Sequence, residues 1–167
     1  METGALRVLV VDDSPIVTRK LCMMMDQIGY RVVGTAANGM EAFVAYRDLQ
    51  PDVVTMDITM PGVDGINATR IIMKAYPDAR IVMVTSHGQE KMVLDALKAG
   101  AKGYVIKPFH PQKVFEAMEK ACKRVVLKDR LHAAVAEREE RSDTVAPEAV
   151  VPPEGAAGSE VKHANEA

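Results

Sequence analysis

The sequence predicts a three-layer α/β sandwich, in which five helices cover a five-stranded parallel sheet with strand order 2-1-3-4-5. Two observations predict this class. Short apolar runs alternate five times with helical patterns before residue 127. Each run is nearly continuously apolar, which is typical of strands covered by helices on both faces. Alternating strands and helices joined by right-handed crossovers give a parallel sheet.

The first part of the chain predicts three strands and two helices. The strands are expected over residues 6–11, 31–36 and 52–56. The first helix follows the first strand, because Ser14 is a good N-cap, Pro15 suits the first helical position and Gly29 ends the apolar stripe. The second helix is expected over residues 39–49, after the cap Asn38.

The second part repeats the pattern. Pro and Gly in residues 58–64 indicate a loop, and Gly100 marks the end of a helix. Strands are expected over residues 80–85 and 103–106, and helices over residues 65–75, 89–99 and from 111 onward. An apolar stripe extends the last helix to residue 127, so we expect the domain to span residues 1–127.

Two further segments follow this domain. Charged helix formers extend the last helix over residues 128–141. Residues 142–167 contain no Leu, Ile, Phe, Met, Tyr or Trp, and residues 131–167 carry 3 Lys or Arg against 8 Asp or Glu. Such a tail cannot bury enough apolar surface to offset its ordering entropy, so we expect a disordered acidic tail over residues 142–167.

Composition excludes several classes of function. The net charge of −2 argues against a general nucleic-acid binder. The apolar runs are too short to span a membrane, and the N-terminus lacks the features of a secretory signal, so we expect a cytoplasmic protein. Cys22 and Cys122 are too few and too far apart in the chain for a disulfide framework or a metal site.

Polar side chains stand where four of the predicted strands end. Asp12 and Asp13 follow the first strand and Asp57 the third, while Thr85 and Lys107 end the fourth and fifth. In this strand order the switch point lies between strands one and three, where ligands of open parallel sheets bind. The three carboxylates are therefore expected to converge, with Thr85 and Lys107 on the far side.

This set of residues predicts phosphoryl transfer. Three carboxylates in one pocket repel one another unless a cation joins them, and hard oxygen ligands suit Mg²⁺. Asp57 would be the nucleophile, and it needs no base because a carboxylate is already ionised. Lys107 supplies a positive charge for the phosphoryl group, and Thr85 supplies a hydroxyl donor.

Four segments resemble the receiver domain of two-component response regulators, and most closely the stand-alone chemotaxis regulators of the CheY group. They are VLVVDDSP (8–15), MDITMPGVDG (56–65), VMVTS (82–86) and KAGAKGYVIKPF (98–109). The resemblance spans residues 6–127. It implies the CheY/flavodoxin-like sandwich, and a signalling protein that assists its own phosphorylation and dephosphorylation rather than an enzyme acting on a separate substrate.

The resemblance also implies individual roles. Asp57 resembles the phosphoacceptor and Lys107 the lysine that pairs with the phosphoryl group. Asp13 resembles a direct Mg²⁺ ligand and Asp12 a ligand acting through water, and the backbone carbonyl of Thr59 would be a further ligand. Thr85 and Tyr104 resemble the switch pair. The Lys107–Pro108 bond is expected to be cis.

Partners follow from the same resemblance. A CheA-like histidine kinase would donate the phosphoryl group, a phosphatase is possible, and the protein would act as a monomer. The face made by the fourth helix, fifth strand and fifth helix would bind the flagellar motor switch protein or another output protein. Residues 86–130 carry 10 Lys or Arg against 5 Asp or Glu, which favours an acidic partner. The candidate lysines are Lys91, Lys98, Lys102, Lys113, Lys120 and Lys123.

Other interpretations stay open. A phosphorelay intermediate that passes its phosphoryl group to a histidine domain, or a regulator of a non-motility output, would keep the same site residues. A flavin carrier of the same fold is disfavoured, because the loop Asp12-Asp13-Ser14-Pro15 repels an anion. Thr59 and His87 flank the route of the attacking water, and the sequence leaves their effect on phosphoryl lifetime undecided.

Overall fold

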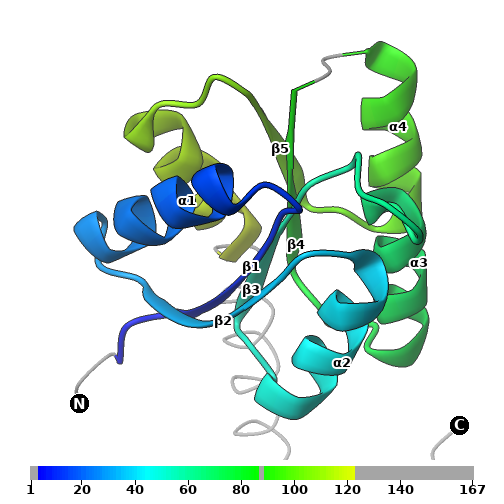
Figure 1. Cartoon of the computed structure of the whole chain (residues 1–167), viewed down its shortest axis with the longest axis horizontal. Coiled ribbons are helices and arrows are strands. Elements are labelled where there is room, and N and C mark those ends of the chain that lie inside the picture. Colours follow the sequence, from blue (N-terminus) through cyan, green and yellow to red (C-terminus); the bar gives the residue numbers. More distant parts are fainter. Residues whose placement is uncertain (1–3, 87–88, 123–167) are drawn as a thin grey trace, which may run out of the picture. The chain divides into compact units, whose positions relative to one another are not determined.

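The computed structural model describes residues 4–86 and 89–122, and in it five parallel strands form one sheet in the order β2-β1-β3-β4-β5 (Figure 1). The strands are β1 (Arg7–Val11), β2 (Arg31–Ala36), β3 (Val53–Met56), β4 (Ile81–Thr85) and β5 (Gly103–Ile106). The helices are α1 (Pro15–Gln27), α2 (Gly39–Leu49), α3 (Gly65–Ala75), α4 (Glu90–Ala99) and a helix over residues 111–122. The predicted class and strand order are confirmed, and the strand bounds differ from the prediction by at most one residue.

Alternate residues of each central strand enter two separate apolar clusters. Leu9 and Val11 of β1 pack under α2, α3 and α4, whereas Val8 and Val10 pack under α1 and helix 111–122. Figure 1 shows these two groups of helices on opposite sides of the sheet. Because side chains alternate between faces, a strand covered on both sides must be apolar at every position. This explains the continuous apolar runs in the sequence.

The two edge strands are less completely covered by the helices than the central strands are. All residues of β3 and β4 are buried, but β2 has exposed residues at both Arg31 and Thr35, and β5 exposes Tyr104 and Ile106. An edge strand has a neighbouring strand on one side only, so the helices do not enclose it completely. The apolar residues of β5 therefore include surface residues as well as the buried Val105.

Side-chain caps fix where the helices begin. The predicted caps Ser14 and Asn38 accept hydrogen bonds from the backbone N–H groups of Val17 (3.4 Å) and Glu41 (2.9 Å). Asp64 caps α3 in the same way. Gly100, with φ of 111°, ends α4 in a backbone conformation that favours glycine. Each of these capped helices starts at the edge of the sheet where the preceding strand ends.

The residue after β3 is held tightly by its backbone neighbours. The N–H of Asp57 donates to the carbonyl of Val11 at 2.9 Å, and the N–H of Gly65 donates to the carbonyl of Ile58 at 2.8 Å. A Cβ on Gly65 would overlap the carbonyl oxygen of Asp57. The start of α3 can approach β3 this closely only because residue 65 has no side chain.

Several predicted features lie outside the described residues. They are the helix extension over residues 128–141, the tail over residues 142–167 and His87. Within the described part of the chain, no helix combines the length and the apolar character needed to cross a membrane. Both cysteines are unbridged; Cys122 is buried, whereas Cys22 is only partly buried.

Substituting Gly65→Ala is expected to destabilise the fold by roughly 2 kcal/mol, because the new methyl group must displace the backbone at Asp57. Urea denaturation of both proteins measures this free energy of unfolding. Gly4→Ala is the matched control, since a Cβ at Gly4 meets no atom within 4 Å. Equal stabilities of the two variants would contradict the packing argument.

Candidate functional site

Three carboxylates from two adjacent strands meet at the carboxyl edge of the sheet. Asp12 and Asp13 follow β1, and Asp57 follows β3, its neighbour in the sheet. One carboxylate oxygen from each residue lies within 4.8 Å of the other two. The carboxylates converge where the strand order predicts, at the point from which successive crossovers run to opposite sides.

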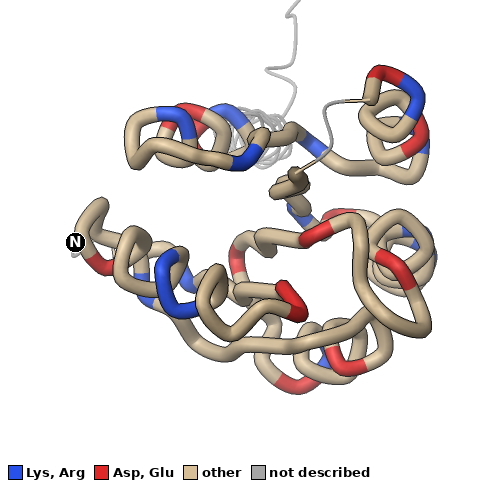
Figure 2. Tube along the Cα trace, turned by 45° about the horizontal axis from the view of Figure 1, so that its top comes forward, with Lys and Arg blue, Asp and Glu red and all other residues tan. Residues whose placement is uncertain are grey.

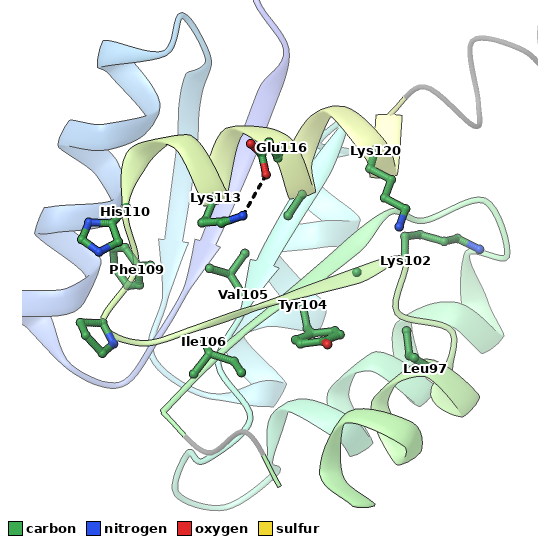
Figure 3. A pocket seen from close by; sticks show the side chains of 13 residues that line it. Leu97, Lys102, Tyr104, Val105, Ile106, Phe109, His110, Lys113, Glu116 and Lys120 are labelled. Atoms are coloured by element: carbon green, nitrogen blue, oxygen red, sulfur yellow. Dashed lines mark hydrogen bonds and ion pairs between the residues drawn. The ribbon is translucent and has the colours of Figure 1, made fainter. Parts of the chain in front are cut away.

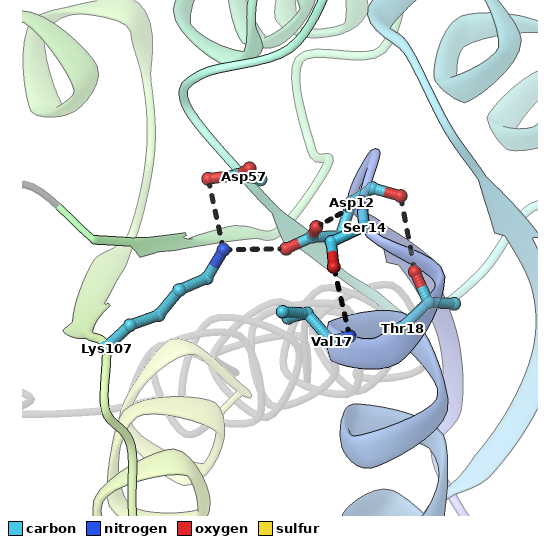
Figure 4. Close-up of polar contacts among 6 residues, drawn as sticks. All are labelled: Asp12, Ser14, Val17, Thr18, Asp57 and Lys107. Carbon is cyan, nitrogen blue, oxygen red and sulfur yellow. Dashed lines mark hydrogen bonds and ion pairs between the residues drawn. The ribbon is translucent and has the colours of Figure 1, made fainter.

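The positive charge of this site belongs to Lys107, which directly follows the edge strand β5. Its Nζ donates a hydrogen bond to Asp12 Oδ2 at 2.9 Å and lies 3.6 Å from Asp57 Oδ1 (Figure 4). The backbone N–H of Lys107 donates to the carbonyl of Thr85 at 2.7 Å, which fixes the turn after β5. The Lys107–Pro108 bond is cis, as the resemblance implied.

The two residues of the acidic pair differ in their partners. Buried Asp12 is engaged on both oxygens, because Oδ1 accepts from the N–H of Ser14 at 2.9 Å and Oδ2 accepts from Lys107. Asp13 is exposed, and its carboxylate makes no hydrogen bond or ion pair within residues 4–86 and 89–122. Asp13 is therefore the carboxylate most available to an external ligand.

The charges of the site are not balanced. Burial raises the pKa of Asp57; Lys107 opposes this shift, while the carboxylates of Asp12 and Asp13 add to it. A raised carboxyl pKa means that the site as it stands disfavours the negative charge on Asp57. An added cation would offset the excess of negative charge among the three carboxylates.

The donor set fits a hard divalent cation. Three carboxylates offer oxygen ligands, and Thr59, whose backbone carbonyl is the predicted fourth ligand, is an exposed residue two positions after Asp57. Mg²⁺ binds through a few carboxylate oxygens and keeps several of its waters, which suits a site that is open on one side. The chemistry of this edge is thus compatible with a metal-assisted reaction at Asp57.

The two predicted switch residues occupy different environments. Thr85, at the end of β4, is fully buried, whereas Tyr104 of β5 is 46% exposed. In the pairing of β4 with β5, Thr85 lies beside Ile106 and Met83 lies beside Tyr104. The tyrosine ring therefore lies at the surface, two positions along the sheet from the buried hydroxyl.

A cavity of about 540 Å³ runs along β5 between α4 and helix 111–122 (Figure 3). Its apolar lining includes Tyr104 and Ile106. Lys and Arg positions lie on both helices and on the segment between them (Figure 2). Of the six lysines predicted for this face, Lys102, Lys113 and Lys120 line the cavity, Lys91 and Lys98 are exposed without lining it, and Lys123 lies outside the described residues.

This cavity is the feature that sequence reasoning missed. The lysines indicated a charged face, but they did not indicate a hollow with an apolar floor. The signal was present in β5, where Tyr104 and Ile106 alternate with buried Val105. Two-residue alternation marks a strand with one face open to solvent.

A family model for the response regulator receiver domain matches residues 8–119. The chain belongs to the response regulator receiver family. It is similar to the chemotaxis protein CheY of Thermotoga maritima, with 48% identity over 117 residues, which are 70% of this chain and 98% of that protein. The CheY of Bacillus subtilis is 43% identical over 116 residues, 70% of this chain and 97% of that protein.

Solved receiver structures agree with this membership. The CheX–CheY–BeF₃–Mg²⁺ complex from Borrelia burgdorferi matches with a TM-score of 0.68 and 37% identity, over 71% of this chain and 90% of that chain. The response regulator domain of Thermotoga maritima CheB matches with a TM-score of 0.64 and 38% identity, over 71% and 95%. The chain therefore contains the receiver domain of a CheY-like response regulator, with Asp12, Asp57 and Lys107 inside the matched range.

Asp57→Asn is expected to stabilise the metal-free fold by roughly 1 kcal/mol, because it removes a buried charge that two neighbouring carboxylates repel. Thermal unfolding in EDTA measures this gain. The gain should shrink as the pH falls through the raised pKa of Asp57, since the folded wild type takes up this proton before the unfolded chain does.

Asp48→Asn is the control for this stabilisation. Asp48 is exposed and, among the described residues, its carboxylate pairs with the adjacent Arg47 alone, so its loss should change stability little. Destabilisation by Asp57→Asn in EDTA, or a gain that grows as the pH falls, would contradict the electrostatic account.

Proposed function

We propose that this chain is a CheY-like response regulator that accepts a phosphoryl group from a histidine kinase on Asp57. The observation that carries this proposal is the position of Lys107, whose ammonium lies 2.9 Å from Asp12 and 3.6 Å from Asp57, beside a three-carboxylate cluster. A nucleophile, a cation and oxygen ligands for a metal thus stand at one edge.

The proposed metal ligands are the carboxylates of Asp12, Asp13 and Asp57 and the backbone carbonyl of Thr59. Bound Mg²⁺ would offset the negative charge of the carboxylates and of the incoming phosphoryl group. Asp13 is the proposed direct ligand, because its carboxylate has no partner within the described residues. Asp12, engaged by Lys107 and Ser14, is the proposed ligand acting through water.

The transfer step follows from these positions. A carboxylate oxygen of Asp57 forms the new O–P bond as the N–P bond of the kinase phosphohistidine breaks. The electron pair of that bond returns to the imidazole nitrogen, which takes a proton from solvent. Lys107 pairs with the phosphoryl oxygens, a role its 3.6 Å distance from Asp57 supports. Dephosphorylation is the attack of water on the same phosphorus.

The proposed output involves the switch residues. The phosphoryl group draws the Thr85 hydroxyl toward it, and the space left behind admits the ring of Tyr104. This shifts an existing equilibrium toward the inward state of Tyr104 and reshapes the lysine-lined cavity beside β5. Tyr104 is suited to this role because it lines that cavity and is half-exposed.

The proposed output partner is the flagellar motor switch protein, so the proposed process is chemotaxis. The similarity of the chain to chemotaxis proteins supports this proposal. We propose that the protein works as a cytoplasmic monomer. A phosphatase is a further proposed partner, as the resemblance to CheY-like regulators implies. A similar CheY from Borrelia burgdorferi binds another protein, CheX. A phosphorelay intermediate or a non-motility regulator would keep the same site residues and differ in the protein that receives the phosphoryl group or binds the phosphorylated domain.

Incubation with [³²P]acetyl phosphate and Mg²⁺ should label the wild-type chain, and Asp57→Asn should lose the label completely because the nucleophilic oxygen is absent. The acid-stable, alkali-labile label of an acyl phosphate is the measured quantity. Asp48→Asn, the same change at an exposed carboxylate, should label like wild type. Full labelling of Asp57→Asn would refute the assignment.

Tyr104→Trp provides a direct readout of the switch, since the chain contains no other Trp. Adding BeF₃⁻ and Mg²⁺ should shift the Trp emission to shorter wavelength, as the indole moves from the surface toward the interior. The double variant Tyr104→Trp/Asp57→Asn should show no shift. An unchanged spectrum in the single variant that still binds BeF₃⁻ would rule out the proposed motion.

A further inference from the structure

The segment that carries the acidic pair lies between β1 and α1, and hydrogen bonds to its backbone hold it in place. The backbone N–H of Asp12 donates to the carbonyl of Ala36 in β2 at 3.0 Å, and the N–H of Ser14 donates to Asp12 Oδ1 at 2.9 Å. The carboxylate of Asp13 makes no hydrogen bond or ion pair within residues 4–86 and 89–122. The direction of the Asp13 side chain therefore depends on how its backbone is held.

One of the contacts to this backbone comes from a side chain of α1. The hydroxyl of Thr18 donates to the carbonyl oxygen of Asp12 at 3.2 Å (Figure 4). That oxygen belongs to the peptide group that joins Asp12 to Asp13. Because a peptide group is planar, a hydrogen bond to its oxygen restricts the rotation on either side of it, ψ of Asp12 and φ of Asp13. Thr18 thereby restricts the position of the Asp13 side chain.

This hydrogen bond is not the one that a helical threonine usually makes. Within a helix, a threonine hydroxyl commonly donates to the carbonyl three or four residues before it. The residue four positions before Thr18 is Ser14, whose carbonyl accepts from the backbone N–H of Thr18 at 2.9 Å. The Thr18 hydroxyl instead donates to the carbonyl six residues before it, beyond the start of α1. The first turn of α1 thus supports the segment that precedes the helix.

Thr18 also lies beside a depression that adjoins the acidic cluster. It lines this depression, of about 360 Å³, together with Asp12 and Asp13. Glu41 adds a third carboxylate to the lining, and Arg19 adds a guanidinium. The excess of carboxylates favours a cation over an anion here. A change in the backbone next to Thr18 therefore alters a part of the surface that suits a cation.

We propose that Thr18 is a positioning residue for Asp13, the proposed direct ligand of Mg²⁺. Its hydroxyl holds the peptide group between Asp12 and Asp13, so the Asp13 carboxylate is oriented through its backbone and its oxygens stay available to a cation. This inference rests on the metal site of the proposed function. Mg²⁺ requires nearly ideal octahedral geometry, so a ligand that is free to turn binds it less tightly. Thr18 acts through Asp13 and supplies no ligand itself.

Calorimetric titration of the full chain with MgCl₂ tests this role. Thr18→Val removes the hydroxyl and keeps the branched shape, so the dissociation constant for Mg²⁺ should rise about fivefold, the effect of one typical hydrogen bond. Thr18→Ser keeps the hydroxyl and should bind Mg²⁺ as the wild type does. Thr35→Val is the matched control, because Thr35 lines the same depression and its hydroxyl makes no hydrogen bond to the described residues. It should leave the affinity for Mg²⁺ unchanged.

The rate of labelling by acetyl phosphate separates positioning from a general loss of structure. Thr18→Val should need about fivefold more Mg²⁺ to reach half of its maximal rate, and that maximum should equal the wild-type maximum. A lower maximum at an unchanged half-saturating Mg²⁺ concentration would overturn the proposal. So would wild-type affinity for Mg²⁺ in Thr18→Val, or an equal loss of affinity in Thr18→Ser. Failure of the proposed function would look different, because the wild type would then bind Mg²⁺ but take no label.

Discussion

The repulsion among three carboxylates at one edge of the sheet, offset only in part by Lys107, is the interaction on which this protein depends. The strand order puts β1 beside β3, so Asp12 and Asp57 lie close together at the ends of these strands. The hydrogen bond from the backbone N–H of Asp57 to the carbonyl of Val11 fixes the separation of the two strand ends. Burial raises the pKa of Asp57, and the neighbouring carboxylates of Asp12 and Asp13 add to this shift. This excess of negative charge favours the binding of a cation, which would offset part of the repulsion.

The central strands and the edge strands of the sheet have different roles. The buried central strands carry the carboxylates and provide a rigid base, while the incompletely covered edge strands border cavities at the surface. Tyr104 lies in β5 and Lys107 directly follows it, so the strand whose end reaches Asp57 also borders the lysine-lined cavity. A change in charge at Asp57 can thus act on a partner surface through a single strand and its neighbour β4.

The sequence was sufficient for the fold and for the position of the site, because both follow from patterns that repeat along the chain. Five apolar runs predicted the strands, and polar residues at strand ends predicted the meeting of Asp12, Asp13, Asp57 and Lys107. It was not sufficient for properties that depend on which atoms remain free. Only the structure shows that Asp12 is engaged on both oxygens, while the Asp13 carboxylate has no partner among residues 4–86 and 89–122. The cavity along β5 was also not predicted, because its shape depends on the spacing of α4 and helix 111–122 and not on the pattern of a single sequence segment.

Chemical mapping of the phosphorylated residue tests the central claim most directly. Borohydride reduces an aspartyl phosphate to homoserine, so treating the phosphorylated chain and sequencing its peptides by mass spectrometry locates the acceptor. The account predicts homoserine at position 57, with Asp12 and Asp13 unmodified. Homoserine at any other position, or a phosphorylated chain that carries none, would contradict it.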